Sequence, residues 1–129
     1  CRAMGKPTQE CYQDALRVLM YLDRHNTVGL RYCACETPAY GMSDSDWATR
    51  HSTSGHVFTY CQAAISWASR KQKSVALSSC EAEIIALSEA TKVVVYLRKL
   101  VSGVGAREVA PTLLYTDSDS ARNRPHWRD

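Results

Sequence analysis

Hydrophobic positions recur along the chain with two different periods, and each period predicts a different kind of element. Over Thr8–His25 the apolar side chains return at helical spacing, and the first residue of this segment is a natural N-cap. A longer helix is predicted to run to Val101, with Ser78 or Ser79 as its cap, because apolar residues again return every three or four positions. The sequence therefore predicts two helices, one of them long.

Apolar and polar residues alternate, or apolar residues cluster, in five shorter segments between and after these helices, and such segments are typical of strands. A turn at Cys61 and Gln62 separates two of them. The order of helix, strands, long helix and strand predicts an α/β fold with a mixed sheet. The predicted strands are Val28–Cys35, Tyr40–Trp47, Ser52–Cys61, Ala63–Ala68 and Pro111–Asp117.

The composition is that of an ordinary globular domain. The chain has 129 residues, of which 45% are hydrophobic and 22% charged, and this length suits one domain. Its six cysteines include no CxxC pair and no zinc-finger spacing, which favours reduced thiols and an intracellular, reducing compartment. We expect no transmembrane segment, because no apolar run approaches the roughly 20 residues needed to span a bilayer.

The formal net charge is +3, which permits a nucleic-acid partner without requiring one. The basic residues gather in two clusters, and either cluster could contact phosphates or serve only solubility. The first comprises Arg70, Lys71 and Lys73, and the second Arg122, Arg124 and Arg128.

Acidic residues stand at the ends of two predicted strands. Asp44 ends the strand that starts near Tyr40, and Asp117 ends the strand at Pro111–Asp117. Carboxylates that converge at one side of a sheet repel one another unless a cation joins them, and oxygen ligands favour Mg²⁺ or Mn²⁺ over zinc. Asp46 is a rival to Asp44, and turn chemistry is the alternative explanation for each acid.

The long helix offers a third acid. Glu83 shares a helix face with Leu87 and Val94, and this apolar face should rest on the sheet. Glu81 shares a more polar helix face with Lys92, and this face is expected to point to solvent. We therefore prefer Glu83 as a metal ligand, with interaction with the helix dipole as the alternative role.

Several ordered motifs resemble the ribonuclease H domain of copia-type retrotransposons. The first comprises Asp44–Ala48, Arg50 and Ser52–Phe58, and the second Ala64–Trp67 with Arg70–Ser79. Further matches are Glu81–Glu83, Ile85–Ala90, Tyr96–Arg98 and Tyr115–Ser118. The stretch Ala15–Leu22 resembles the segment that joins reverse transcriptase to that domain.

This resemblance implies a ribonuclease H-like mixed sheet flanked by helices, and hydrolysis of the RNA strand of RNA–DNA hybrids with two Mg²⁺ or Mn²⁺ ions. The catalytic and metal-binding acids of the family correspond to Asp44, Glu83 and Asp117. If the domain is active, the first cluster of basic residues is a candidate for phosphate contacts with the nucleic acid. Residues 1–36 would be a helix and strand from the reverse transcriptase connection, and residues 37–129 the ribonuclease H-like domain without its last segment.

The chain departs from the family pattern after Ala121, where a final helix with a fourth metal-site residue is expected. Asp129 does not take the place of that residue. The departure supports an alternative expectation, a catalytically inactive module that acts as a structural or binding subunit. Its protein partner would then cover the truncated C-terminal side.

Overall fold

In the computed structural model of this protein, residues 6–34, 37–105 and 111–117 are described. The chain forms two compact units, Cys1–Leu30 and Arg31–Asp129. The second cluster of basic residues, Asp129 and the cysteines at positions 1 and 35 lie outside the described residues. The other cysteines, Cys11, Cys33, Cys61 and Cys80, carry free thiols.

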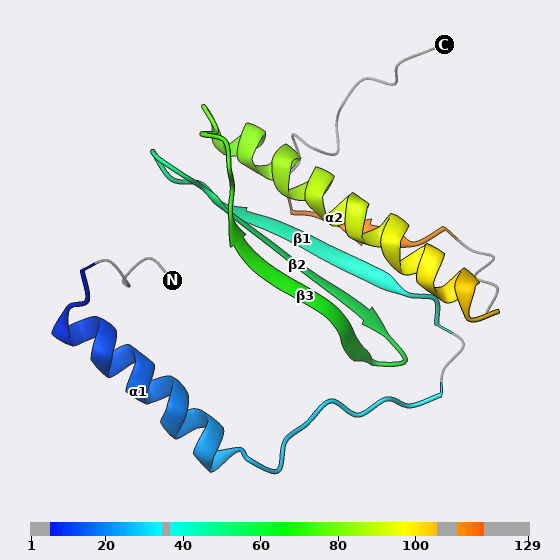
Figure 1. The fold of residues 1–129 in the computed structure, drawn as a ribbon, viewed down its shortest axis with the longest axis horizontal. Helices are drawn as coiled ribbons and strands as arrows, with labels where there is room; N and C mark the ends of the chain where they lie inside the picture. Colours follow the sequence, from blue (N-terminus) through cyan, green and yellow to red (C-terminus); the bar gives the residue numbers. More distant parts are fainter. Residues whose placement is uncertain (1–5, 35–36, 106–110, 118–129) are drawn as a thin grey trace. The chain divides into compact units, whose positions relative to one another are not determined.

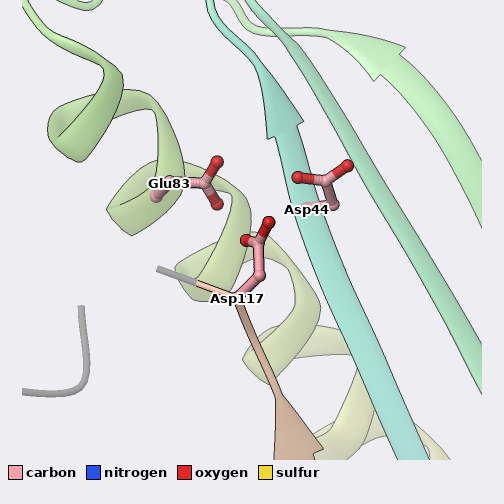
Figure 2. Close-up of side chains that lie close together, drawn as sticks. All are labelled: Asp44, Glu83 and Asp117. Carbon is pink, nitrogen blue, oxygen red and sulfur yellow. The ribbon is translucent and has the colours of Figure 1, made fainter. Parts of the chain in front are cut away.

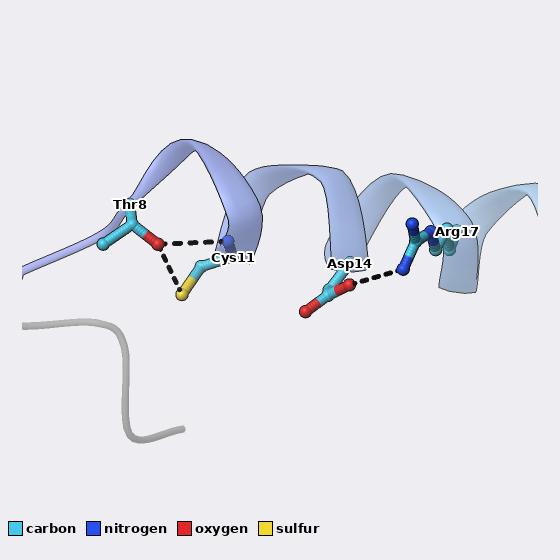
Figure 3. A network of polar contacts seen from close by, with 4 residues as sticks. All are labelled: Thr8, Cys11, Asp14 and Arg17. Atoms are coloured by element: carbon cyan, nitrogen blue, oxygen red, sulfur yellow. Dashed lines mark hydrogen bonds and ion pairs between the residues drawn. The ribbon is translucent and has the colours of Figure 1, made fainter.

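The first unit contains helix α1, Gln9–Arg24, as the sequence predicts. Thr8 is its N-cap: the Thr8 Oγ1 atom accepts a hydrogen bond from the Cys11 backbone N–H at 3.3 Å. The same hydroxyl donates to the Cys11 Sγ atom at 3.2 Å, and this bond lowers the pKa of the thiol (Figure 3). Asp14 and Arg17 form an exposed ion pair one turn later, at 3.1 Å, of a kind that adds little stability.

The strand predicted at Val28–Cys35 is wrong for residues 28–34, which form no strand. Two isolated hydrogen bonds attach Tyr32 and Cys33, which belong to the second unit, to the sheet. They do not form the regular series of backbone bonds that makes a ladder. The Cys33 backbone N–H donates to the Cys61 carbonyl at 3.0 Å, and the Tyr32 hydroxyl donates to the Ala64 carbonyl at 2.8 Å. Apolar and polar residues alternate in this part of the sequence, but a ladder needs an adjacent strand along its whole length.

The second unit is a four-stranded mixed sheet with one long helix packed on it (Figure 1). The sheet order is β3-β2-β1-β4; β1 pairs antiparallel with β2 and parallel with β4, and β2 pairs antiparallel with β3. This is the ribonuclease H-like α/β fold that the sequence predicts. Its elements are β1 (Tyr40–Asp46), β2 (Thr53–Tyr60), β3 (Ala63–Lys71), α2 (Ser79–Gly103) and β4 (Leu113–Tyr115).

The turn between β2 and β3 falls at Cys61 and Gln62, as predicted. Both residues have positive φ, 50° and 67°. A two-residue hairpin turn with two left-handed residues has the twist that the flanking strands need. Neither residue is glycine, so the hairpin forms in spite of the steric cost of this conformation.

Small residues allow α2 to approach the sheet closely. The buried residues of α2 are Ala82, Ala86 and Ala90, spaced by four so that they share one face. Opposite them, the Phe58 ring of β2 is fully buried. A Cβ atom on Gly41 of β1 would overlap this ring, so the core requires glycine at position 41. In the described part of the chain, no helix is long and apolar enough to cross a membrane.

Replacing Gly41 with alanine should lower the free energy of unfolding by about 1–3 kcal/mol, because the new methyl group forces a closely packed core to shift. Urea unfolding followed by circular dichroism measures the change. Gly29→Ala is the matched control, since a Cβ atom there would meet nothing within 4 Å. Equal losses of stability in the two variants would contradict the packing explanation.

Candidate metal centre

Three carboxylates from three different elements gather near the C-terminal ends of β1 and β4 (Figure 2). One oxygen from each of Asp44, Glu83 and Asp117 lies within 4.8 Å of the others. Asp44 belongs to β1, Glu83 to the first turns of α2, and Asp117 follows β4 by two residues. The structure thus brings together the three acids that the sequence singled out, and their roles as ligands and catalysts remain a prediction.

The parallel register of β1 and β4 explains why Asp44 and Asp117 meet. Met42 pairs with Tyr115 at the end of the ladder. Two residues further along each chain, the same register sets Asp44 opposite Asp117. Because parallel strands end at the same edge of a sheet, the two carboxylates have to lie close together. The rival residue, Asp46, lies at the end of β1 and is not one of the three acids in this group.

The start of α2 gives different surroundings to the two acids of Glu81-Ala82-Glu83. Ser78 is the N-cap, and its Oγ atom accepts a hydrogen bond from the Glu81 N–H at 3.2 Å. The Glu81 carboxylate turns back and accepts a hydrogen bond from the Leu77 N–H at 2.7 Å, a variant of the capping box. Glu83, two residues later, is half-buried. The helix face deduced from the sequence therefore places Glu83, and not Glu81, in the acidic group.

Hydrogen bonds from Ser45 reach two of the three carboxylates. The Ser45 hydroxyl donates to Glu83 Oε1 at 2.7 Å, and the Ser45 backbone N–H donates to Asp44 Oδ1 at 2.7 Å. The other Glu83 oxygen, Oε2, is buried and has no hydrogen-bond partner within residues 6–34, 37–105 and 111–117. A buried carboxylate oxygen without a partner is costly, and a cation is the natural ligand for it.

The donor set fits a hard divalent cation. All three side chains offer carboxylate oxygens, which are the ligands that Mg²⁺ and Mn²⁺ prefer, and no thiol or imidazole belongs to the group. Three negative charges within 4.8 Å of one another also repel. The residues present therefore fit such an ion, both by the chemistry of the donors and by the unpartnered Glu83 oxygen.

Gln72 is a structural residue of this region that the sequence did not indicate. It is 2% exposed, and its Nε2 atom donates to Ser54 Oγ at 3.0 Å and to the Ala82 carbonyl at 2.9 Å. These bonds join the end of β3 to the turn of α2 that carries Glu83. Gln72 is the one uncharged residue in the run Arg70–Lys73. This difference from its neighbours is the only feature of the sequence that could have indicated a structural role for Gln72.

The basic residues Arg70, Lys71 and Lys73 are exposed at and just after the end of β3. The register pairs Arg70 with Ser54, and Ser54 with Ser45. The basic cluster therefore lies at the same level along the sheet as the carboxylates, two strands away, or roughly 10 Å between backbones. Whether these side chains contact nucleic acid remains a prediction.

His56 of β2 lies on the side of the sheet that α2 covers, with its ring centroid 5.6 Å from that of Phe58. Burial lowers the pKa of His56, and the positive charge of Arg70 lowers it further, against the opposing effect of Glu89. The folded protein therefore favours the neutral ring, which suits a packing role between sheet and helix.

No family model and no solved structure matches the chain. It is 45% identical over 96 residues to the Secreted RxLR effector protein 161 of Plasmopara viticola, covering 70% of this chain and 68% of that protein. It is 33% identical over 124 residues to the Retrovirus-related Pol polyprotein from transposon TNT 1-94 of Nicotiana tabacum, and 32% identical over 123 residues to that from transposon RE1 of Arabidopsis thaliana.

The matches to the two Pol polyproteins cover 93% and 92% of this chain, but only 9% and 8% of the polyproteins themselves. The fold and the similarity define the class, a ribonuclease H-like domain of retroelement origin. Within that class, the chain belongs to the same family as the Plasmopara viticola protein and the matching segments of the plant transposon Pol polyproteins.

Replacing Glu83 with glutamine should raise the free energy of unfolding in EDTA by about 1 kcal/mol, because it removes one of three repelling charges and keeps an oxygen for Ser45. Urea unfolding without divalent ions measures this gain. Glu81→Gln is the matched control on the same helix turn and should lose about 0.3–1 kcal/mol of interaction with the helix dipole. A loss of stability in both variants would show that charge repulsion is not significant.

Proposed function

We propose that this domain hydrolyses the RNA strand of RNA–DNA hybrids. The observation that carries the proposal is the convergence of Asp44, Glu83 and Asp117, with one buried Glu83 oxygen left without a hydrogen-bond partner among the described residues. The similarity to Pol polyproteins of plant transposons and the resemblance to copia-type ribonuclease H domains support the same assignment.

Asp44, Glu83 and Asp117 would hold Mg²⁺ or Mn²⁺, two ions in the proposed reaction. When bound, such ions supply an activated water and stabilise the negative charge that develops during phosphodiester hydrolysis. The contribution of the protein is to fix three carboxylates, from β1, α2 and the residues after β4, at one edge of the sheet. No side chain is needed as a general base.

The substrate would be recognised mainly through its backbone. Arg70, Lys71 and Lys73 offer positive charge at the level of the carboxylates and would contact phosphates. Such contacts carry no sequence information, so the ribose 2′-hydroxyl would distinguish the RNA strand from the DNA strand.

Cleavage of a labelled RNA–DNA hybrid in the presence of Mg²⁺ tests this proposal. The Asp44→Asn and Asp117→Asn variants should each lose more than about 100-fold in rate, because a neutral amide is a poor ligand for a hard cation and even supporting residues of a metal site cost 10–100-fold. Equal cleavage by the parent chain and the Asp117→Asn variant would remove this carboxylate from the mechanism.

Asp46→Asn provides the matched control for Asp44→Asn, since the two acids lie on one strand two residues apart. The Asp46 variant should keep most of the activity if Asp44 is the ligand. The reverse result would assign the metal to Asp46 and contradict the site proposed above.

A second candidate function is a non-catalytic binding module. The register places Met42, Trp67 and Tyr115 on the face of the sheet that points away from α2. These side chains are 49%, 63% and 53% exposed. Leu113 lies on the same face and is 53% exposed. Exposed apolar patches on a folded domain commonly mark the place where a protein partner binds.

Metal binding distinguishes the two candidates. In the catalytic case, Mg²⁺ or Mn²⁺ should raise the free energy of unfolding by about 2.7 kcal/mol at a concentration 100 times the Kd. Thermal unfolding over a titration of each ion measures this effect, which should disappear in the Asp44→Asn variant. A parent chain whose stability is unchanged by both ions would favour the binding module.

A further inference from the structure

Ser45 occupies an unusual position between two acids of β1. The side chains of successive strand residues point to opposite faces. The residues of β1 that share the parity of Ser45 are Gly41 and Ser43, which are buried on the side that α2 covers. Ser45 therefore faces the helix, while the neighbouring residue, Asp44, has the opposite parity and belongs to the carboxylate group.

Two hydrogen bonds from this one residue reach carboxylates on two different elements. Its backbone N–H donates to Asp44 Oδ1 on β1, and its hydroxyl donates to Glu83 Oε1 on α2, each at 2.7 Å. The second distance lies within the short range of charge-assisted bonds from a hydroxyl to a carboxylate. The side chain of Glu83 has three rotatable bonds, and a bond at Oε1 limits its orientations.

With Oε1 engaged by Ser45, the remaining oxygen of the same carboxylate, Oε2, is the one that is buried and unpartnered. The bond from Ser45 thus leaves Oε2 as the Glu83 oxygen without a hydrogen bond among the described residues. A site whose ligands are already oriented binds more tightly than one that has to order them on binding.

We propose that Ser45 is a positioning residue of the metal centre, one that orients the carboxylates of Asp44 and Glu83 before an ion binds. This inference rests on the metal site of the proposed function. Ser45 does not itself coordinate the ion; it acts through the two acids it holds. The backbone bond to Asp44 survives any substitution except proline, so the hydroxyl is the part that mutation can test.

Ser43 supplies a matched control. It lies two residues earlier on the same strand and the same face, and it is 4% exposed. Its Oγ atom is buried and has no hydrogen-bond partner in the part of the chain that the structure describes. Ser43→Ala and Ser45→Ala therefore remove the same hydroxyl group from the same face of one strand, but only the second removes a bond to a carboxylate.

The test is a Mn²⁺ titration of the full chain, followed by thermal unfolding, for the parent, Ser43→Ala, Ser45→Ala and Ser45→Thr. Ser45→Ala should weaken the Kd for Mn²⁺ about 10- to 100-fold, the range for supporting residues of metal sites. Ser43→Ala should keep the parent value, and Ser45→Thr should restore most of the affinity, because it keeps the hydroxyl.

The outcomes separate this inference from the function on which it rests. If Mn²⁺ stabilises the parent but Ser45→Ala and Ser43→Ala have the same Kd as the parent, the role of Ser45 is overturned and the metal site stands. If Mn²⁺ does not stabilise the parent, both fail together. If all serine variants weaken binding equally, the effect is one of general packing and the positioning role is overturned.

Discussion

The carboxylate group depends on the parallel pairing of β1 with β4. This ladder is short, with Tyr40, Gly41 and Met42 opposite Leu113, Leu114 and Tyr115. It nevertheless fixes the register that carries Asp117 to Asp44. A parallel pair needs a crossover connection, and here α2 provides it, so that the helix that makes the pairing possible also carries the third acid. A shift of one residue between β1 and β4 would separate the carboxylates and turn Leu114 to the wrong face.

The close approach of α2 to the sheet is the second requirement of this arrangement. The buried face of the helix consists of alanines, and the sheet below it has a glycine and serines next to Phe58. Small side chains reduce the apolar area that the contact buries, but they let the Glu83 carboxylate reach the strands. The buried bonds of Gln72 to Ser54 and Ala82 then tie helix and sheet together where apolar packing is thin.

Much of this fold could be predicted from local sequence signals. The cap at Ser78 and the turn at Cys61 and Gln62 are each determined by residues close in the sequence, and each is confirmed. The strand predicted at Val28–Cys35 failed because alternation reports how side chains face and not whether a neighbouring strand exists. The roles of Ser45 and Gln72 could not be predicted, since each depends on partners 38 and 10 residues away that only the folded chain brings into reach.

The two candidate functions use neighbouring parts of one sheet and depend on different side chains. Asp44 and Asp117 lie two residues beyond the exposed side chains of Met42 and Tyr115, on the side of the sheet away from α2 by the alternation of strand residues. The acids repel one another in the absence of an ion, so they add nothing to the stability of a purely structural module. The exposed apolar face, in turn, contributes nothing to holding an ion. A domain with both features can lose either one and keep the fold, because the core of alanines, Gly41 and Phe58 belongs to neither surface.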